Sequence, residues 1–386
     1  MASTMQRLLV AIWLLALPCA VQAQAPTRNL GSVSAQSADD AELQNLLEEL
    51  SRVGGLLAKA NTPSEIVSAA MRQVDVLGRL AAKSKPEERT SWLRQMADTL
   101  QLAASNGPAS DHAAFDRLAS LSHQVAQSMP GSSLAAYIAF RELGADYSAK
   151  ISSPDVDVTK AQQAWHDRLI AFVQSYPDAE DAPTAMMELA AVSESLGRKS
   201  EARSWYEQVA QSFPGKPAAT QAQGNLHWMD LQGHVLHLTL PLLFADNDQQ
   251  DVPFDIEELH GKVVIVCFWS NREPRSSEEL GELNQLATQY QTNGLRLLCV
   301  NMDGTPKETR MFLGEPQGPA VHVFQRGGLQ GSLALRYGLT ALPKLVLVGR
   351  DGKVILQPAG ITELQEFLRE GFTPSRNQES GIGNQG

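Results

Sequence analysis

The side chains of this sequence that could do redox chemistry are its three cysteines, Cys19, Cys267 and Cys299. Cys19 lies in an apolar run near the N-terminus. The other two lie in apolar, strand-like runs, KVVIVCFW over 262–269 and LRLLCV over 295–300. No two cysteines are close enough in the sequence to form a Cys-x-x-Cys pair. Because a thiol inside a buried strand is inaccessible and hard to ionise, we interpret Cys267 and Cys299 as core residues.

The motifs that would indicate a bound cofactor or metal are weak. The last six residues match G-x-G-x-x-G by letters, but they follow no strand and open no helix, which a dinucleotide site requires. His227, His234 and His237 cluster in the sequence. A strand over 235–240 would place residues three apart on opposite faces, so His234 and His237 would be poor co-ligands. The sequence therefore predicts no cofactor and no metal site.

Composition excludes one class of partner. The chain of 386 residues has a formal net charge of -11, and its acidic surface would repel a phosphate backbone, so we expect no nucleic acid partner. The length suggests two or three domains, and 43% hydrophobic residues is an ordinary globular content.

The N-terminus has the pattern of an export signal. Arg7 precedes an apolar run over 8–20, and small residues around 21–23 suit cleavage before Gln24. An uncleaved anchor is the alternative. A lipidated Cys19 is disfavoured because Pro18 stands where a small residue is expected. We predict a signal peptide over 1–23, a disordered leader over 24–38, a disordered tail over 373–386, and a periplasmic or cell-envelope location with no stable membrane span after cleavage.

Residues 39–232 show helical periodicity. Thr62 is a predicted N-cap, with Pro63 in the first turn and Glu65 placed to reach back. The pattern Gln-Ser-aromatic or Met-Pro occurs at 127–130, 174–177 and 211–214, each time at the end of a helical stretch. This spacing, and the segment 185–214 in particular, resembles a tetratricopeptide repeat. The resemblance implies a helical-repeat domain that binds peptides or protein surfaces, and the alternative is a helical scaffold without a ligand or a dimerisation module.

The C-terminal part, residues 234–372, alternates strand and helix. The two cysteine-containing runs flank a helical pattern over 276–290, which indicates parallel strands joined by a crossover. Further along the chain, a strand over 345–348, a turn at 350–353, a strand over 354–356 and a helix over 362–369 follow Pro343.

Three ordered motifs in this part resemble the thioredoxin superfamily, in its TlpA-like, peroxiredoxin-related branch. They are Leu259-His260-Gly261-Lys262 before the first strand, the strand end over 300–305, and Tyr337-Gly338 before Pro343. The resemblance implies a thioredoxin fold with a cis peptide at Pro343. The predicted fold class is therefore multidomain, with an all-α, tetratricopeptide-like N-terminal domain and an α/β thioredoxin-like C-terminal domain.

The resemblance also locates a redox motif, and this sequence departs from the family there. The Cys-x-x-Cys of active relatives aligns with Glu273 and Ser276. Neither residue can form a mixed disulfide, so we predict no catalytic residue at these degenerate positions. The same helix start could still hold a peptide or a small anion in a groove formed by Arg272, Pro274, Arg275, Ser276, Leu342 and Pro343. The alternative is a capped, solvated helix start that binds no ligand.

These observations favour a non-catalytic function. We expect an exported, redox-inactive thioredoxin-like protein that acts as a binding or assembly module of the bacterial cell envelope. Its partner would be a protein or peptide, bound by the helical repeats and by the vacated groove. The alternative is a thiol–disulfide oxidoreductase of the TlpA-like thioredoxin family.

Overall fold

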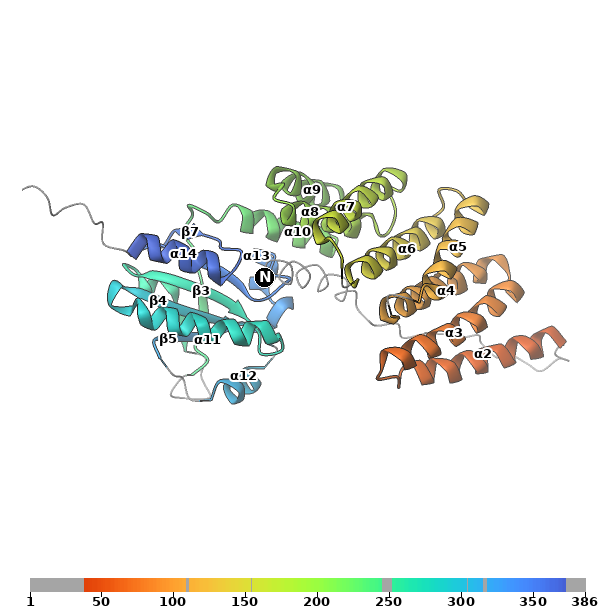
Figure 1. Cartoon of the computed structure of the whole chain (residues 1–386), viewed down its shortest axis with the longest axis horizontal. Helices are drawn as coiled ribbons and strands as arrows, with labels where there is room; N and C mark the ends of the chain where they lie inside the picture. Colours follow the sequence, from red (N-terminus) through yellow and green to blue (C-terminus); the bar gives the residue numbers. More distant parts are fainter. Residues whose placement is uncertain are drawn as a thin grey trace, which may run out of the picture. The chain divides into compact units, whose positions relative to one another are not determined.

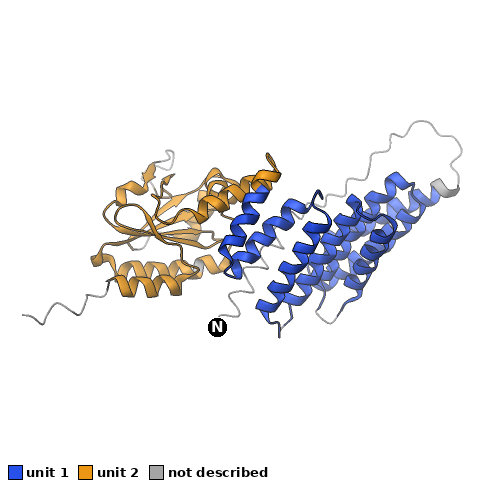
Figure 2. Ribbon diagram, turned by 90° about the horizontal axis from the view of Figure 1, so that it is seen from above, with its two compact units in different colours: residues 1–209 blue, residues 210–386 orange. Residues whose placement is uncertain are grey.

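The computed structural model describes residues 38–108, 111–153, 155–244, 252–303, 305–314 and 318–372. The predicted signal peptide, the predicted tail and almost all of the predicted leader lie outside these residues. The chain divides into two compact units, residues 1–209 and 210–386, which Figure 2 colours separately. Among the helices of the described residues, none has the length and apolar character that a membrane span requires.

The first unit is built from helices that pack against the next helix in sequence from α2 to α8, while α4 also contacts α6. This confirms the all-α part of the predicted fold class. The helices are α2 (Ala38–Leu57), α3 (Pro63–Lys83), α4 (Pro86–Asn106), α5 (Ala113–Ser128), α6 (Ser133–Ile151), α7 (Val158–Ser175), α8 (Ala182–Ser195) and α9 (Lys199–Ser212), the last of which runs across the division between the units.

Local signals fix the ends of these helices. Thr62 caps α3 as predicted: its hydroxyl accepts from the Glu65 amide while the Glu65 carboxylate accepts from the Thr62 amide. The repeated motif also ends helices as predicted. Met129 and Tyr176 follow α5 and α7 with nearly equal dihedral angles, φ −139° and ψ 63° against φ −137° and ψ 59°. The following proline then prevents the helix from continuing.

The second unit contains α10 (Pro217–Met229) and a five-stranded mixed sheet in the order β5-β4-β3-β6-β7 (Figure 1). β3 is central and pairs in parallel with β4 and antiparallel with β6. A short ribbon of β1 (Thr239–Pro241) and β2 (Pro253–Asp255) precedes the sheet. The remaining elements are β3 (Val263–Trp269), α11 (Pro274–Gln289), β4 (Leu295–Asn301), α12 (Pro306–Leu313), β5 (Ala320–Phe324), α13 (Ser332–Tyr337), β6 (Lys344–Val348), β7 (Val354–Leu356) and α14 (Ile361–Phe372).

Each face of the sheet has its own apolar core. Ile265, Cys267 and Trp269 of β3 point to the face that α11 and α14 cover (Figure 1). Val264, Val266 and Phe268 point to the other face, where they pack with α13 and with the segment that precedes β1. Both faces of β3 are buried, and this explains why its sequence is a continuous apolar run. This α/β architecture confirms the second part of the predicted fold class.

The helix α10 belongs to the second unit, whereas the sequence placed the helical domain's end near residue 232. The reason is a close backbone approach between α10 and the end of α13. A Cβ added to Gly224 would lie 2.1 Å from the Leu335 carbonyl oxygen, and one added to Gly338, at φ +57°, would lie 2.2 Å from Asn225 Oδ1. Only glycine allows this contact.

Side chains of α10 complete the same packing. The Trp228 ring meets Phe268 edge to face at 6.3 Å, and the Lys344 ammonium lies 4.0 Å from the centre of the Trp228 ring. The sequence shows that 217–229 is helical, but helical periodicity carries no information about which domain a helix packs against.

We predict that Gly224→Ala destabilises the second unit by about 2 kcal/mol, because the new methyl group must displace backbone in a packed interface. Gly281→Ala is the matched control, since Gly281 lies in α11 with no atom within 4 Å of the added Cβ. There the change should stabilise by about 0.5 kcal/mol through helix propensity. Hydrogen exchange of the β3 and β4 amides measures both effects; equal protection in the two variants would contradict the close approach.

Candidate functional site

The two positions predicted to be degenerate, Glu273 and Ser276, lie at the N-cap and in the first turn of α11, after the loop that follows β3. Glu273 is the N-cap residue of α11 and makes no side-chain capping hydrogen bond, and Pro274 follows in the first turn. Ser276 is fully buried, and its Oγ has no hydrogen-bond partner within the described residues. The helix start therefore has the positive end of a helix dipole without a nucleophile to ionise.

The two arginines of the predicted groove already face carboxylates of the chain. Arg272 lies 3.1 Å from Glu308 of α12, and Arg275 donates from Nε to Glu279 Oε1 at 2.7 Å. Glu279 is only 8% exposed, and its burial raises its pKa, an effect that the nearby Arg275 partly offsets. A bound anion would have to compete with these internal ion pairs.

The structure places the cis peptide where the sequence predicts it, between Leu342 and Pro343. In the antiparallel pairing of β3 with β6, Phe268 is opposite Lys344. Pro343 therefore lies next to the end of β3, beside the loop that begins at Ser270. The topology thus brings the predicted groove residues to one edge of the sheet, although Leu342 itself is buried in the core at 9% exposure.

Both thiols of the second unit are far from reactive. Cys267 and Cys299 occupy paired positions on the neighbouring strands β3 and β4, and both are free and fully buried. Burial raises the pKa of each thiol well above its ordinary value. The prediction that these two cysteines are core residues is confirmed, and neither can act as a thiolate at neutral pH.

A buried hydrogen-bond network holds the loop that follows β3. Asp303 accepts from the Ser270 hydroxyl, from the Asn271 amide at 2.9 Å and from Asn301 Nδ2 at 2.6 Å. Thr309 Oγ1 in turn donates to Asn301 Oδ1 at 2.9 Å. Asp303 is 1% exposed and Asn301 is fully buried.

We did not predict the hydrogen-bond network around Asp303 from the sequence. Its signal was present, since Ser270 and Asn301 stand directly at the ends of the two buried strands. Parallel strands end at the same edge of a sheet, so such polar side chains come together there.

His227, His234 and His237 line one hollow together with Asp230. The assumption of a strand over 235–240 is wrong, because β1 begins only at Thr239 and the segment before it is not a regular strand. His234 and His237 therefore do not lie on opposite faces of a strand. Within the described residues no group of three histidine, cysteine, aspartate or glutamate side chains is arranged to hold a metal ion.

We predict that Asp303→Asn destabilises the second unit by about 2 kcal/mol or more, because an amide nitrogen would replace one of the two oxygens that together accept from three donors. Glu308→Gln is the control: it removes an exposed ion pair with Arg272 and should change stability by less than about 1 kcal/mol. Urea denaturation of both variants measures the difference. If Asp303→Asn costs no more than the control, the network does not hold the loop.

Comparison with known proteins gives one family. Residues 261–354 match the family model described as Thioredoxin-like. The thiol-disulfide oxidoreductase ResA of Bacillus thuringiensis subsp. konkukian is 25% identical over 134 residues, which cover 34% of this chain and 75% of that protein. ResA of Halalkalibacterium halodurans is 24% identical over 128 residues, covering 32% of this chain and 71% of that protein.

Solved structures match the same part of the chain. A putative thiol:disulfide interchange protein DsbE from Chlorobium tepidum is 22% identical and covers 37% of this chain and 96% of its own, with a TM-score of 0.32. The thioredoxin domain of a thiol-disulfide oxidoreductase from Bacteroides vulgatus is 17% identical and covers 37% and 98%, with a TM-score of 0.32. The matched family, the central sheet and the cis-proline together identify the C-terminal part of this chain as a thioredoxin-like domain, similar in sequence to the ResA oxidoreductases.

Proposed function

We propose that this chain is an exported, redox-inactive member of its fold class that acts as a binding or assembly module of the bacterial cell envelope. One observation carries the proposal: Cys267 and Cys299 are fully buried in the sheet, and the start of α11, where the family resemblance places the redox cysteines, has Glu273 and Ser276 instead. Export rests on the predicted signal peptide, and the bacterial setting on the sources of the similar proteins.

A protein without thiol–disulfide chemistry can still bind a partner, and this chain offers two surfaces for it. One is the proposed groove at the start of α11, and its support is that the cis-proline Pro343 lies next to the end of β3, from which the chain leads to α11. The helical unit supplies the other surface, because arrays of helical hairpins commonly bind proteins or peptides. The proposed partner is therefore a protein or a peptide.

The second candidate is a thiol–disulfide oxidoreductase. The observation that favours it is the name of the ResA proteins to which the domain is similar. A fold, however, does not fix the chemistry of a site, and this site lacks both attacking and resolving sulfur.

We predict that the purified protein does not accelerate insulin reduction by dithiothreitol. The double variant Glu273→Cys/Ser276→Cys should gain activity, because residue 273 is half-buried at the helix start and residue 276 is enclosed, as an attacking and a resolving thiol require. Glu273→Ser/Ser276→Ala serves as the matched inactive control. Wild-type turnover that Cys267→Ala abolishes would support the oxidoreductase instead.

The binding role has its own test, affinity capture from an envelope fraction with the full chain as bait. We expect a reproducible partner that stays bound in excess dithiothreitol, because no mixed disulfide is needed. Capture that disappears on reduction, or that does not exceed the level of an unrelated acidic bait, would contradict a non-covalent binding module.

A further inference from the structure

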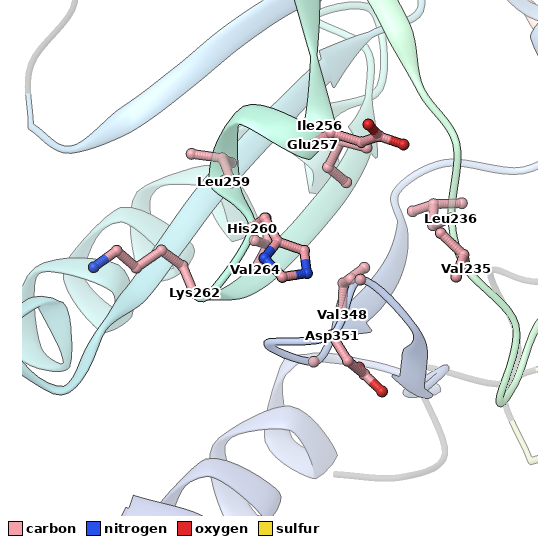
Figure 3. Close-up of a pocket in the computed structure, with 12 residues that line it drawn as sticks. Val235, Leu236, Ile256, Glu257, Leu259, His260, Lys262, Val264, Val348 and Asp351 are labelled. Carbon is pink, nitrogen blue, oxygen red and sulfur yellow. The ribbon is translucent and has the colours of Figure 1, made fainter.

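A second hollow, drawn in Figure 3, lies near the start of β3. It opens beside Val264 near the start of β3, whereas the motif follows Trp269 at the end of that strand. Five residues of strand separate these points, which is roughly 17 Å. The hollow has a volume of about 310 Å³, a size that suits a small molecule.

The floor of the hollow is apolar. It is formed by four buried side chains of the sheet and of the segments beside it, Leu236, Ile256, Val264 and Val348. One wall is the turn that contains Gly349 and Gly352, which bring backbone but no side chain to the edge of the hollow. Such a floor favours the apolar body of a ligand.

The rim carries both signs of charge. Glu257 and Asp351 are its acidic side chains, and they lie on opposite sides of the His260 ring (Figure 3). His260 and Lys262 are exposed, and no hydrogen bond or ion pair of their side chains occurs within the described residues. Lys262 extends away from the hollow in Figure 3, but its flexible stem lets the ammonium turn toward a bound anion.

We propose that this hollow binds a free apolar α-amino acid. The side chain of the ligand would pack on the four floor residues. Its ammonium group would bind one of the two rim carboxylates, Glu257 or Asp351, and its carboxylate would bind His260 and Lys262. A purely anionic ligand would meet two carboxylates and a purely cationic one would meet the basic pair, so a zwitterion with an apolar side chain complements the rim best. This site is separate from the degenerate motif and does not depend on the function proposed for it.

The test uses three probes with the same side chain and different charges: L-phenylalanine, N-acetyl-L-phenylalanine, whose acetyl group replaces the ammonium by a neutral amide, and L-phenylalaninamide, which lacks the carboxylate. Calorimetry or saturation-transfer NMR with the full chain measures their affinities. We expect phenylalanine to bind with a dissociation constant on the order of a millimolar. Each derivative should bind about tenfold more weakly, because it loses one charge-assisted contact.

Variants assign each contact. The double variant His260→Gln/Lys262→Gln should bind phenylalanine and its amide equally. The double variant Glu257→Gln/Asp351→Asn should bind phenylalanine and its N-acetyl derivative equally. Lys307→Gln, an exposed lysine of α12, is the control and should behave as wild type.

Three results would overturn the proposal. The first is that phenylalanine shows no saturable binding at millimolar concentrations. The second is that a derivative binds the wild type as tightly as phenylalanine does. The third is that the double variants still bind phenylalanine about tenfold more tightly than the derivative that each variant should no longer distinguish from it. Because all substituted residues are exposed, unchanged circular dichroism is expected and makes each result interpretable.

Discussion

The second unit depends on one constraint, the burial of β3 on both faces and along both edges. Ile265, Cys267 and Trp269 enter one core while Val264, Val266 and Phe268 enter the other. A shift of register by one residue would exchange the two sets, so the strand is tightly fixed. The same constraint holds Cys267 inside the sheet and leads the chain into the loop at Ser270, which precedes Glu273 and Ser276 at the start of α11.

Hydrogen bonds and ion pairs, rather than a reactive side chain, occupy the loop after β3 and the start of α11. Asp303 ties the loop to the end of β4, and the arginines of the helix start face Glu308 and Glu279. The helix dipole remains, but the groups it could act on are a buried hydroxyl and paired charges. These contacts hold the loop and the helix start in place. They do not include a base beside the Ser276 hydroxyl that would activate it as a nucleophile.

Much of the second unit could be predicted from sequence because the signals are local. The apolar run over 262–269 and the Asp351-Gly352 turn determine their own structure, and the thiols were correctly assigned to the core, whereas the cis peptide at Pro343 was expected from the family resemblance. The packing of α10 in the second unit could not be predicted, because it depends on the close approach of Gly224 to the backbone at Leu335, more than a hundred residues further along the chain. The ion pairs of Arg272 and Arg275 were missed for a related reason: they depend on how surface side chains turn after the helices have packed.

The central claim is that the second unit has no accessible thiolate, and the alkylation rate of its cysteines tests it most directly. Native protein is treated with iodoacetamide at neutral pH, and the modification of Cys267 and Cys299 is followed by peptide mass spectrometry. The account predicts that both are modified only as fast as the sheet unfolds, and rapidly in denaturant. Fast modification of either cysteine in the folded protein would contradict it.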